Sequence, residues 1–279
     1  MFELSALFSE AKLYAVLFVV FTALAVLTRG KEALKWSPDL RMSAFVNVGM
    51  LHFNALFGIL FIGIYTGVKA GYEAMNFPQI PREFWDGVPT PLIWLALLIV
   101  YDMSIYWIHR WMHNGWLWPM HAVHHSDTEL HFLSWSRGHA LEQIVIMTFV
   151  FVCSAWLGLS IAEVFMLAFV KGLHQYYVHS NIDWDHGPFK LLLASPQYHR
   201  WHHADVIEAY DTNFASIFPF IDKLFGTYYF PGSAVNVPTG FPGTPKNDFV
   251  ALICYPFMEW YRMIREKFSA KPSALDPAE

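Results

Sequence analysis

The longest uncharged run of the sequence constrains the fold most. Residues 42–68 contain no Lys, Arg, Asp or Glu, and a helix of about 20 mostly apolar residues is enough to cross the hydrocarbon core of a bilayer. The composition agrees, because 55% of the residues are hydrophobic and 15% are charged, against about 25% charged in an average soluble protein. The sequence therefore predicts an integral membrane protein.

Four apolar runs are predicted to form transmembrane helices. They cover residues 12–28, 42–68, 88–108 and 143–162. A further apolar pattern at 161–178 contains Glu163 and Lys171, so the last two runs form either a helical hairpin or a half-inserted pair. The expected fold is an all-α membrane bundle of about four transmembrane helices.

The whole chain, residues 1–279, is predicted to be a single membrane domain. Residues 1–87 contain the N-terminal spans, and residues 88–231 contain most of the histidines. Residues 232–279 contain a loop rich in Pro and Gly, an amphipathic helix at 249–268 and a tail. We expect the amphipathic helix to lie on the membrane surface.

The charges around the first apolar run predict the orientation. Glu3 and Glu10 precede the run, and four basic residues follow it within 29–41. A cleaved signal peptide has its basic residues in front, so none is expected here. Basic loops remain in the cytoplasm, and the third span then places its C-terminal histidines on the cytoplasmic face. The sequence predicts a multi-pass protein with all its histidine clusters on that face.

Three histidine clusters have the spacing of one helix face, where residues three or four positions apart are neighbours. Asn114-Gly115 suits the end of the first helix, Pro119 the start of a second, and Ser195-Pro196 the start of a third. The clusters are His109 and His113; His121, His124 and His125; and His199, His202 and His203.

These eight imidazoles exceed what one metal ion can bind, so the clusters predict two metal ions. Neutral imidazole is a common protein ligand of zinc, copper and iron. One cluster alone would be ordinary at a membrane interface, but three on one membrane face predict a dimetal site in a cytoplasmic helical cap. The two cysteines, Cys153 and Cys254, lack the paired spacing of structural zinc sites.

Other residues near the clusters are further candidates for the site. His179 is expected to be a ninth ligand. The residues that could add a ligand or orient one are His174, Asp183, Asp127 and Asp205. The residues that could line a substrate pocket are Trp107, Trp111, Trp135 and Trp201, although tryptophan also favours the membrane interface without any catalytic role.

At these residues the sequence resembles the fatty acid hydroxylase/sterol desaturase superfamily of integral-membrane di-iron oxygenases. The matching motifs are H-x3-H at 109–113 and H-x2-H-H at 121–125 and 199–203. The motifs "VHSN" at 178–181 and "NFASIFPFIDKLFGTYYFP" at 213–231 are also similar. The resemblance covers about residues 95–231. Some members have a further histidine shortly after the one that matches His179, where this chain has Asp183.

The resemblance implies a function and a set of cofactors. The eight clustered histidines and His179 would bind two iron ions, and O2 would be the co-substrate. The reaction would hydroxylate or desaturate a C–H bond of a lipid such as a sterol, a fatty acyl chain or a sphingoid chain. A separate protein of the ferredoxin, rubredoxin or cytochrome b5 type would supply two electrons, since the chain contains no recognisable haem, flavin or NAD motif. The net charge of −5 gives no reason to expect nucleic acid.

Several alternatives remain open at this point. An ether-lipid monooxygenase of the alkylglycerol type and a carotenoid hydroxylase or ketolase would use the same kind of site. A metal transporter is the alternative that is not an enzyme, but it should place its ligands near the middle of the bilayer on broken helices. The clusters here lie at the ends of predicted spans. The sequence determines neither the lipid nor the oligomeric state.

Overall fold

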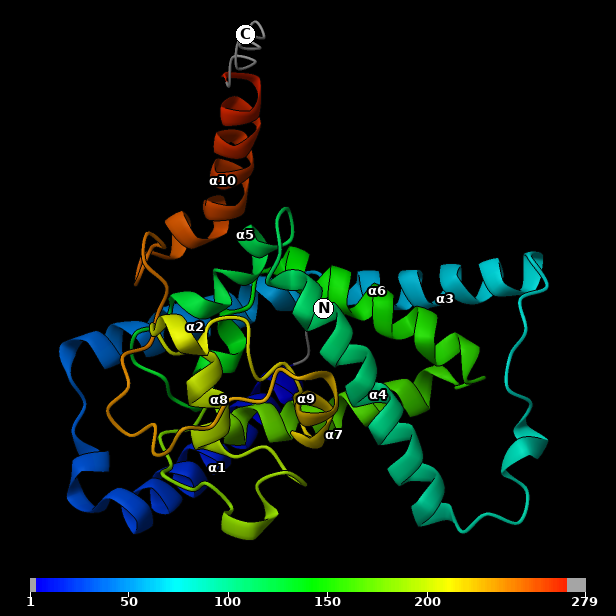
Figure 1. Cartoon of the computed structure of the whole chain (residues 1–279), viewed down its shortest axis with the longest axis horizontal. Coiled ribbons are helices and arrows are strands. Elements are labelled where there is room, and N and C mark those ends of the chain that lie inside the picture. Colours follow the sequence, from blue (N-terminus) through cyan, green and yellow to red (C-terminus); the bar gives the residue numbers. More distant parts are fainter. Residues whose placement is uncertain (1–3, 270–279) are drawn as a thin grey trace, which may run out of the picture.

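The structure, a computed structural model that describes residues 4–269, is all-α (Figure 1). The predicted fold class is thereby confirmed, and the tail predicted beyond residue 269 lies outside the described residues. The α-helices are α1 Leu4–Arg29, α2 Pro38–Ala55, α3 Gly58–Ala74, α4 Thr90–Met112, α5 Trp118–His121, α6 Ala140–Trp156, α7 Ile161–Val178, α8 Pro196–His202, α9 Phe220–Phe225 and α10 Phe249–Ser269. The 3-10 turns are η1 Gly30–Leu34, η2 Arg82–Trp85, η3 His124–Ser126, η4 Phe132–Arg137, η5 Gly187–Phe189 and η6 Ile207–Ala209.

Two helices are long and apolar enough to cross a membrane by length and composition, at Tyr14–Leu34 and Thr90–Met112. A third candidate exists if α2 and α3 count as one span, although the pair is bent by 44°. The helix α6 is apolar but shorter. The structure thus contains two to three candidate spans where the sequence predicted about four, and the prediction of one continuous helix over 42–68 is wrong.

A buried polar network holds α2 on one side of this bend. The Arg137 side chain is fully buried beside α2 and donates hydrogen bonds to Asn47 Oδ1 (2.7 Å), Ser43 Oγ (3.1 Å) and Ser126 Oγ (3.2 Å). It also forms an ion pair with Asp127 at 3.5 Å. Because this network binds α2 to η3 and η4, α2 stays beside the histidine region, while α3 packs against α6.

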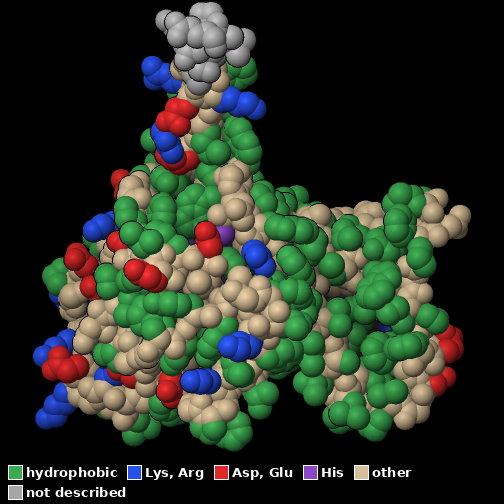
Figure 2. Space-filling model, in the orientation of Figure 1, with side chains coloured by type: hydrophobic (Ala, Val, Ile, Leu, Met, Phe, Trp, Pro, Cys, Tyr) green, Lys and Arg blue, Asp and Glu red, His purple; other side chains and the backbone are tan. Residues whose placement is uncertain are grey.

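The apolar surface indicates an integral membrane protein. In Figure 1, α3, α4 and α6 extend to the right, and in Figure 2 this lobe is covered mainly by hydrophobic side chains. Charged side chains gather on the left part and at the far tip of the lobe (Figure 2). The exposed apolar residues of this lobe include Ile59, Ile62, Leu92, Leu95 and Val152.

The two last apolar runs form separate helices, α6 and α7, joined by residues 157–160. The Ser160 side chain accepts a hydrogen bond from the Glu163 backbone N–H, which begins α7 with a capping box. Buried side chains of α6 and α7, among them Phe151 and Val164, pack against Tyr65 of α3 and Tyr101 of α4. The sequence left the relation of these two runs open, and the structure assigns them to one packed core.

Candidate metal centre

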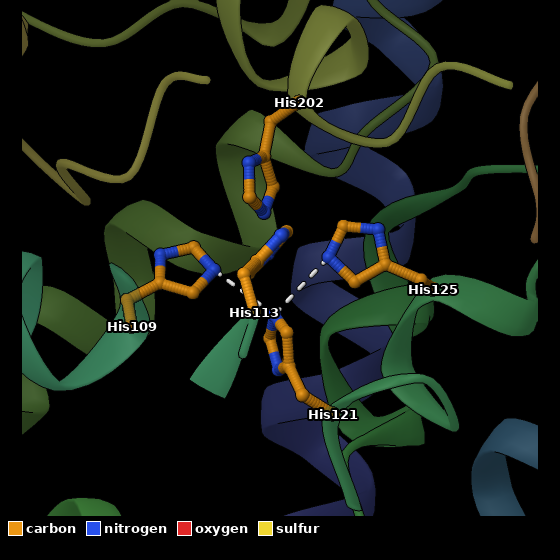
Figure 3. A group of neighbouring side chains, drawn as sticks. All are labelled: His109, His113, His121, His125 and His202. Carbon is orange, nitrogen blue, oxygen red and sulfur yellow. Dashed lines mark hydrogen bonds between the residues drawn. The ribbon is translucent and has the colours of Figure 1, made fainter. Parts of the chain in front are cut away.

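Nine histidines converge in two groups at the ends of these helices. Within each group the candidate ligand nitrogens all lie within 4.8 Å of one another. Figure 3 shows the five rings of group A pointing toward a common centre. Group A consists of His109, His113, His121, His125 and His202, and group B consists of His124, His179, His199 and His203. These are the same nine residues that the sequence singled out.

The two H-x2-H-H motifs each contribute to both groups. In the first motif the outer pair, His121 and His125, joins group A, while His124 joins group B. In the second motif the pattern is reversed, because the outer pair belongs to group B and His202 to group A. The first cluster presents both of its rings to group A, as predicted, but the rings of the second and third clusters are directed to two centres and not to one. On a helix, positions i+3 and i+4 point about 100° apart, which is enough to direct neighbouring rings to two centres.

The second cluster also departs from the predicted helix. The helix α5 starts with Pro119 in its first turn, as the sequence predicted, but it ends at His121. The 3-10 turn η3 then begins at His124. The third cluster follows the prediction, since the Ser195 side chain accepts a hydrogen bond from the Tyr198 N–H and Pro196 begins α8.

The hydrogen bonds of group A define which ring nitrogens are free. His109 Nδ1 lies 2.8 Å from the Phe214 carbonyl oxygen, and His121 Nδ1 lies 3.0 Å from Glu142 Oε1. The Phe214 carbonyl can only accept, so His109 Nδ1 carries the proton, and ionised Glu142 accepts from His121 Nδ1 in the same way. Each neutral ring then has a lone pair on Nε2. The two Nε2 atoms are 3.0 Å apart. Two lone pairs at this distance repel each other unless a cation lies between them.

Group B shows the same arrangement. His179 Nδ1 lies 2.8 Å from the Gln175 carbonyl oxygen, so its Nε2 carries the lone pair. That Nε2 is 3.2 Å from His124 Nε2 and 2.9 Å from His199 Nε2. Both groups therefore have the donor set that a metal ion requires.

The nitrogen separations also fit a shared ion. Two nitrogens about 2.1 Å from one metal lie about 3.0 Å apart at a right angle and about 3.4 Å apart at a tetrahedral angle. The contacts in group A measure 3.0 Å for His109–His121 and 3.1 Å for His125–His121. Buried Nε2 atoms of His113 and His202 have no hydrogen-bond partner within residues 4–269. Five inward-facing imidazoles exceed the four ligands of a structural zinc site.

Burial keeps these rings neutral. Removal from water lowers the pKa of His202 to about 4 and that of His179 to about 3. Burial, followed by the neighbouring histidines, lowers the pKa of His124 and His203 well below its usual value. Neutral imidazole is the form that binds a metal ion, so the pocket is ready to bind metal near pH 7.

Two carboxylates contact group A that the sequence analysis did not select. Glu142 faces His121, and Asp211 Oδ1 lies 3.2 Å from His113 Nδ1. Glu142 is the third residue of α6 and completes a capping box with His139. Burial raises the pKa of the Glu142 carboxyl to about 8, and a cation among the imidazoles would oppose this shift. In the sequence, the signal that could have identified Glu142 is a single acidic residue at the start of an apolar helix.

The additional polar candidates lie outside both groups. His174 Nε2 contacts the Ala194 carbonyl oxygen at 3.1 Å. Asp183 forms ion pairs with two arginines, Arg29 and Arg200. The Asp127 carboxylate belongs to the Arg137 network, and Asp205 accepts a hydrogen bond from the hydroxyl of Tyr210.

A cavity of about 450 Å³ opens onto four of the nine histidines, His113, His125, His202 and His203. Its other walls include Trp118, Phe241 and Met263. Figure 2 shows histidine at the surface below the base of α10, where this cavity opens. The cavity gives a ligand direct access to group A.

The four tryptophans proposed for a pocket lie away from this cavity. Trp107 packs against Phe225, and Trp111 packs against Phe149. The Trp201 indole donates a hydrogen bond to the Gly232 carbonyl oxygen. Trp135 lies beside group B, with its ring centre 6.3 Å from that of His179, and it lines a separate cavity of about 240 Å³.

Residues 94–227 match the profile of a known family, described as fatty acid hydroxylase. These residues belong to the fatty acid hydroxylase family. The matched segment contains all nine histidines of groups A and B. The resemblance stated from the histidine motifs is thereby confirmed.

Several curated relatives support this assignment of the fatty acid hydroxylase family. An ornithine lipid hydroxylase from Rhizobium tropici is 27% identical, over 69% of this chain and 58% of the relative. An alkylglycerol monooxygenase from Danio rerio is 33% identical, over 68% of this chain and 41% of the relative. A methylsterol monooxygenase from Arabidopsis thaliana is 30% identical, over 56% of each chain. The chain thus spans only part of the length of these relatives, and no solved structure matches it.

Proposed function

We propose that this protein is a membrane-bound di-iron oxygenase that uses O2 and two electrons to hydroxylate or desaturate a C–H bond of a lipid. The observation that carries the proposal is the pair of buried histidine groups whose unprotonated Nε2 atoms face one another at about 3 Å. The proposed iron ligands are the nine histidines of groups A and B. Membership of the fatty acid hydroxylase family supports iron over other metals that bind imidazole.

Both proposed reactions balance with the lipid, O2, two electrons and two protons as the reactants. Hydroxylation converts R–H, O2, two electrons and two protons into R–OH and water. Desaturation uses the same reactants, removes two hydrogens from the lipid and gives two molecules of water. An iron pair, when bound, would supply the redox chemistry that reduces O2. The chain holds the imidazoles neutral and oriented, and apolar walls such as Trp118 and Phe241 limit water in the cavity.

The location of the site supports a lipid substrate. His113 caps the C-terminal end of α4, and His179 caps that of α7, so both groups lie just beyond apolar helices. We place this face in the cytoplasm, following the basic residues of 29–41, and α10 on the membrane surface beside it. The electrons would come from a separate donor protein of the ferredoxin, rubredoxin or cytochrome b5 type.

Ether-lipid cleavage is the second candidate, favoured by the 33% identity to an alkylglycerol monooxygenase. Hydroxylation of the carbon beside an ether oxygen gives a hemiacetal. This product breaks into an alcohol and an aldehyde, with no further oxidation. The same site and the same electron count therefore serve both reactions.

Metal analysis and lipid mass spectrometry test the proposal. We expect about two iron ions per chain and O2 consumption that requires both a reductant and lipid. Lipid extracts from cells with and without the gene should differ by one added oxygen for hydroxylation, two lost hydrogens for desaturation, or a lost chain for ether cleavage. The exposed His52 provides the control His52→Ala. One zinc ion or none, unaffected by His124→Ala and His202→Ala, would contradict the proposal.

A further inference from the structure

The backbone segment 212–218 contacts group A through its carbonyl oxygens. The Phe214 carbonyl lies 2.8 Å from His109 Nδ1, and the Thr212 carbonyl lies 2.7 Å from His202 Nδ1. Each carbonyl accepts the Nδ1 proton and so leaves Nε2 free to face the centre of group A. The direction of these two carbonyls therefore determines which nitrogen each ring presents.

A buried carboxylate fixes the first carbonyl. Asp222 is fully buried, and its Oδ2 accepts a hydrogen bond of 2.9 Å from the Ala215 N–H. A trans peptide unit is planar and its N–H and C=O point in opposite directions. Because Asp222 holds the Ala215 N–H on one side, the Phe214 carbonyl of the same peptide unit must point the other way, toward His109.

The second carbonyl is fixed by the same residue through Thr227. The Asn213 N–H donates to the Thr227 carbonyl oxygen at 2.9 Å, which directs the Thr212 carbonyl toward His202 by the same peptide geometry. Thr227 is held in turn by Asp222: its hydroxyl donates to Asp222 Oδ1 at 2.7 Å, and its N–H donates to the Asp222 carbonyl at 2.9 Å.

Asp102 anchors the rest of the segment to α4. This fully buried carboxylate accepts hydrogen bonds from the backbone N–H groups of Ser216 (3.0 Å), Ile217 (3.1 Å) and Phe218 (2.8 Å). Asp102 lies on the same helix as His109. The segment is thus fixed relative to the helix that carries the ligand it orients.

We infer that Asp222 is a positioning residue for the metal ion of group A, and that Asp102 supports it. The inference rests on the proposed metal binding of the two groups and goes beyond it by assigning a role to a carboxylate that touches no histidine ring. No ring of group B is bonded to the segment 212–218 within the described residues; His179 Nδ1 uses a carbonyl of its own helix. Asp222 also accepts a hydrogen bond from the Tyr198 hydroxyl on α8, so its loss should weaken group A more than group B.

The test measures the binding of cobalt(II) to the purified full chain in detergent, without O2 or lipid. The variant Asp222→Asn keeps the side-chain volume but replaces an oxygen acceptor by an N–H2 donor. We expect one ion per chain to bind about 10- to 100-fold more weakly, the usual cost of losing a partner that orients a ligand. The other ion should weaken less, since Asp222 reaches group B only through Tyr198 of α8. The visible spectrum of cobalt distinguishes the two sites, with His199→Ala as the reference for loss at group B.

A matched control is Asp185→Asn. Asp185 is exposed, and its carboxylate also accepts a backbone N–H, that of Gly187 at 2.9 Å, but it contacts neither group. Thr227→Val removes only one of the bonds to Asp222 and should give a smaller loss at the same site, which provides a second variant if Asp222→Asn fails to fold.

Equal weakening of both ions in a folded variant would overturn the inference, as would unchanged binding of both. If the unchanged protein itself binds fewer than two ions, the proposed function fails instead. The two failures are therefore distinguishable.

Discussion

Groups A and B differ in how their imidazoles are held. Four of the five rings in group A have an Nδ1 bonded to another part of the chain, namely to Phe214, Asp211, Glu142 and Thr212. In the part of the chain that the structure describes, His179 is the one ring of group B with a bonded Nδ1, and its partner lies on its own helix. His203 Nδ1 is buried without a partner. Group A is oriented by residues 211–214 and by Glu142 of α6, whereas group B depends on the packing of its rings.

This difference implies two ions of unequal affinity. Partners that fix the tautomer and direction of a ligand typically change metal affinity by about 10- to 100-fold. Group A also faces the cavity of about 450 Å³ with three of its five rings. We therefore expect the ion of group A, which lies next to this cavity, to be bound more tightly than the ion of group B.

Removal of one ligand from each group should have the largest effect. We expect His202→Ala to weaken the ion of group A and His199→Ala that of group B, each by more than the about 100-fold upper range for indirect partners. The loss should be greater for His199→Ala, because group B keeps three rings and group A keeps four. Metal content after dialysis against a chelator measures both. An equal loss of metal affinity in the two variants would contradict the proposed difference between the groups.

Arg137→Ala should weaken both groups. It leaves Asp127 as an unpaired buried charge, which costs about 3–5 kcal/mol of folding free energy, and it removes a bond to Ser126 beside His125. Since the first H-x2-H-H motif feeds both groups, both ions should weaken together. Thermal unfolding and metal content should decline in parallel, and selective loss of one ion would contradict this account.

Glu142→Gln should weaken group A alone. Glutamine retains an acceptor oxygen and also serves in a capping box, so α6 should be preserved, while the carboxylate that a bound cation would keep ionised beside His121 is lost. We expect affinity for one ion to fall toward the lower end of the about 10- to 100-fold range. Chelator competition measures the change, and circular dichroism verifies that the helix content is retained.

Asp211→Asn should give the smallest effect. The Asp211 side chain is 71% exposed, so water screens its interaction with His113. Asp211 also has a positive φ of 56°, a conformation that asparagine tolerates well. We expect less than about a tenfold change in metal affinity. A change larger than that of Glu142→Gln would show that the exposure of a carboxylate does not predict its effect on metal affinity.

Local spacing patterns were sufficient to find eight of the nine histidines, whereas His179 belongs to no cluster and was selected separately. Spacings of three and four predict neighbouring rings, and Ser195-Pro196 predicts the start of α8 where it occurs. The patterns could not predict that each motif divides between two ions, since this depends on how α8 lies against η3. Such an arrangement is set by tertiary packing and leaves no periodicity to detect.

The other features that the sequence did not predict also depend on tertiary packing. The charge-free run 42–68 gives no sign of the bend after Ala55. The contacts that hold α2 join Ser43 and Asn47 to Asp127, which lies 84 and 80 positions away. Glu142 and Asp222 act through a distant ring and a distant backbone segment. Buried carboxylates of this kind become visible only when the fold brings their partners together.

The division of each motif between the groups has a consequence for how chains of this kind can change in length. The helix α8 supplies His202 to one centre and His199 to the other within a single turn, so any rotation of α8 displaces ligands of both centres at once. One inserted residue inside either motif would disrupt two ions together. An insertion between the motifs rotates neither of them by itself, so insertions that leave the Arg137 network and Glu142 in place are compatible with an unchanged pair of centres.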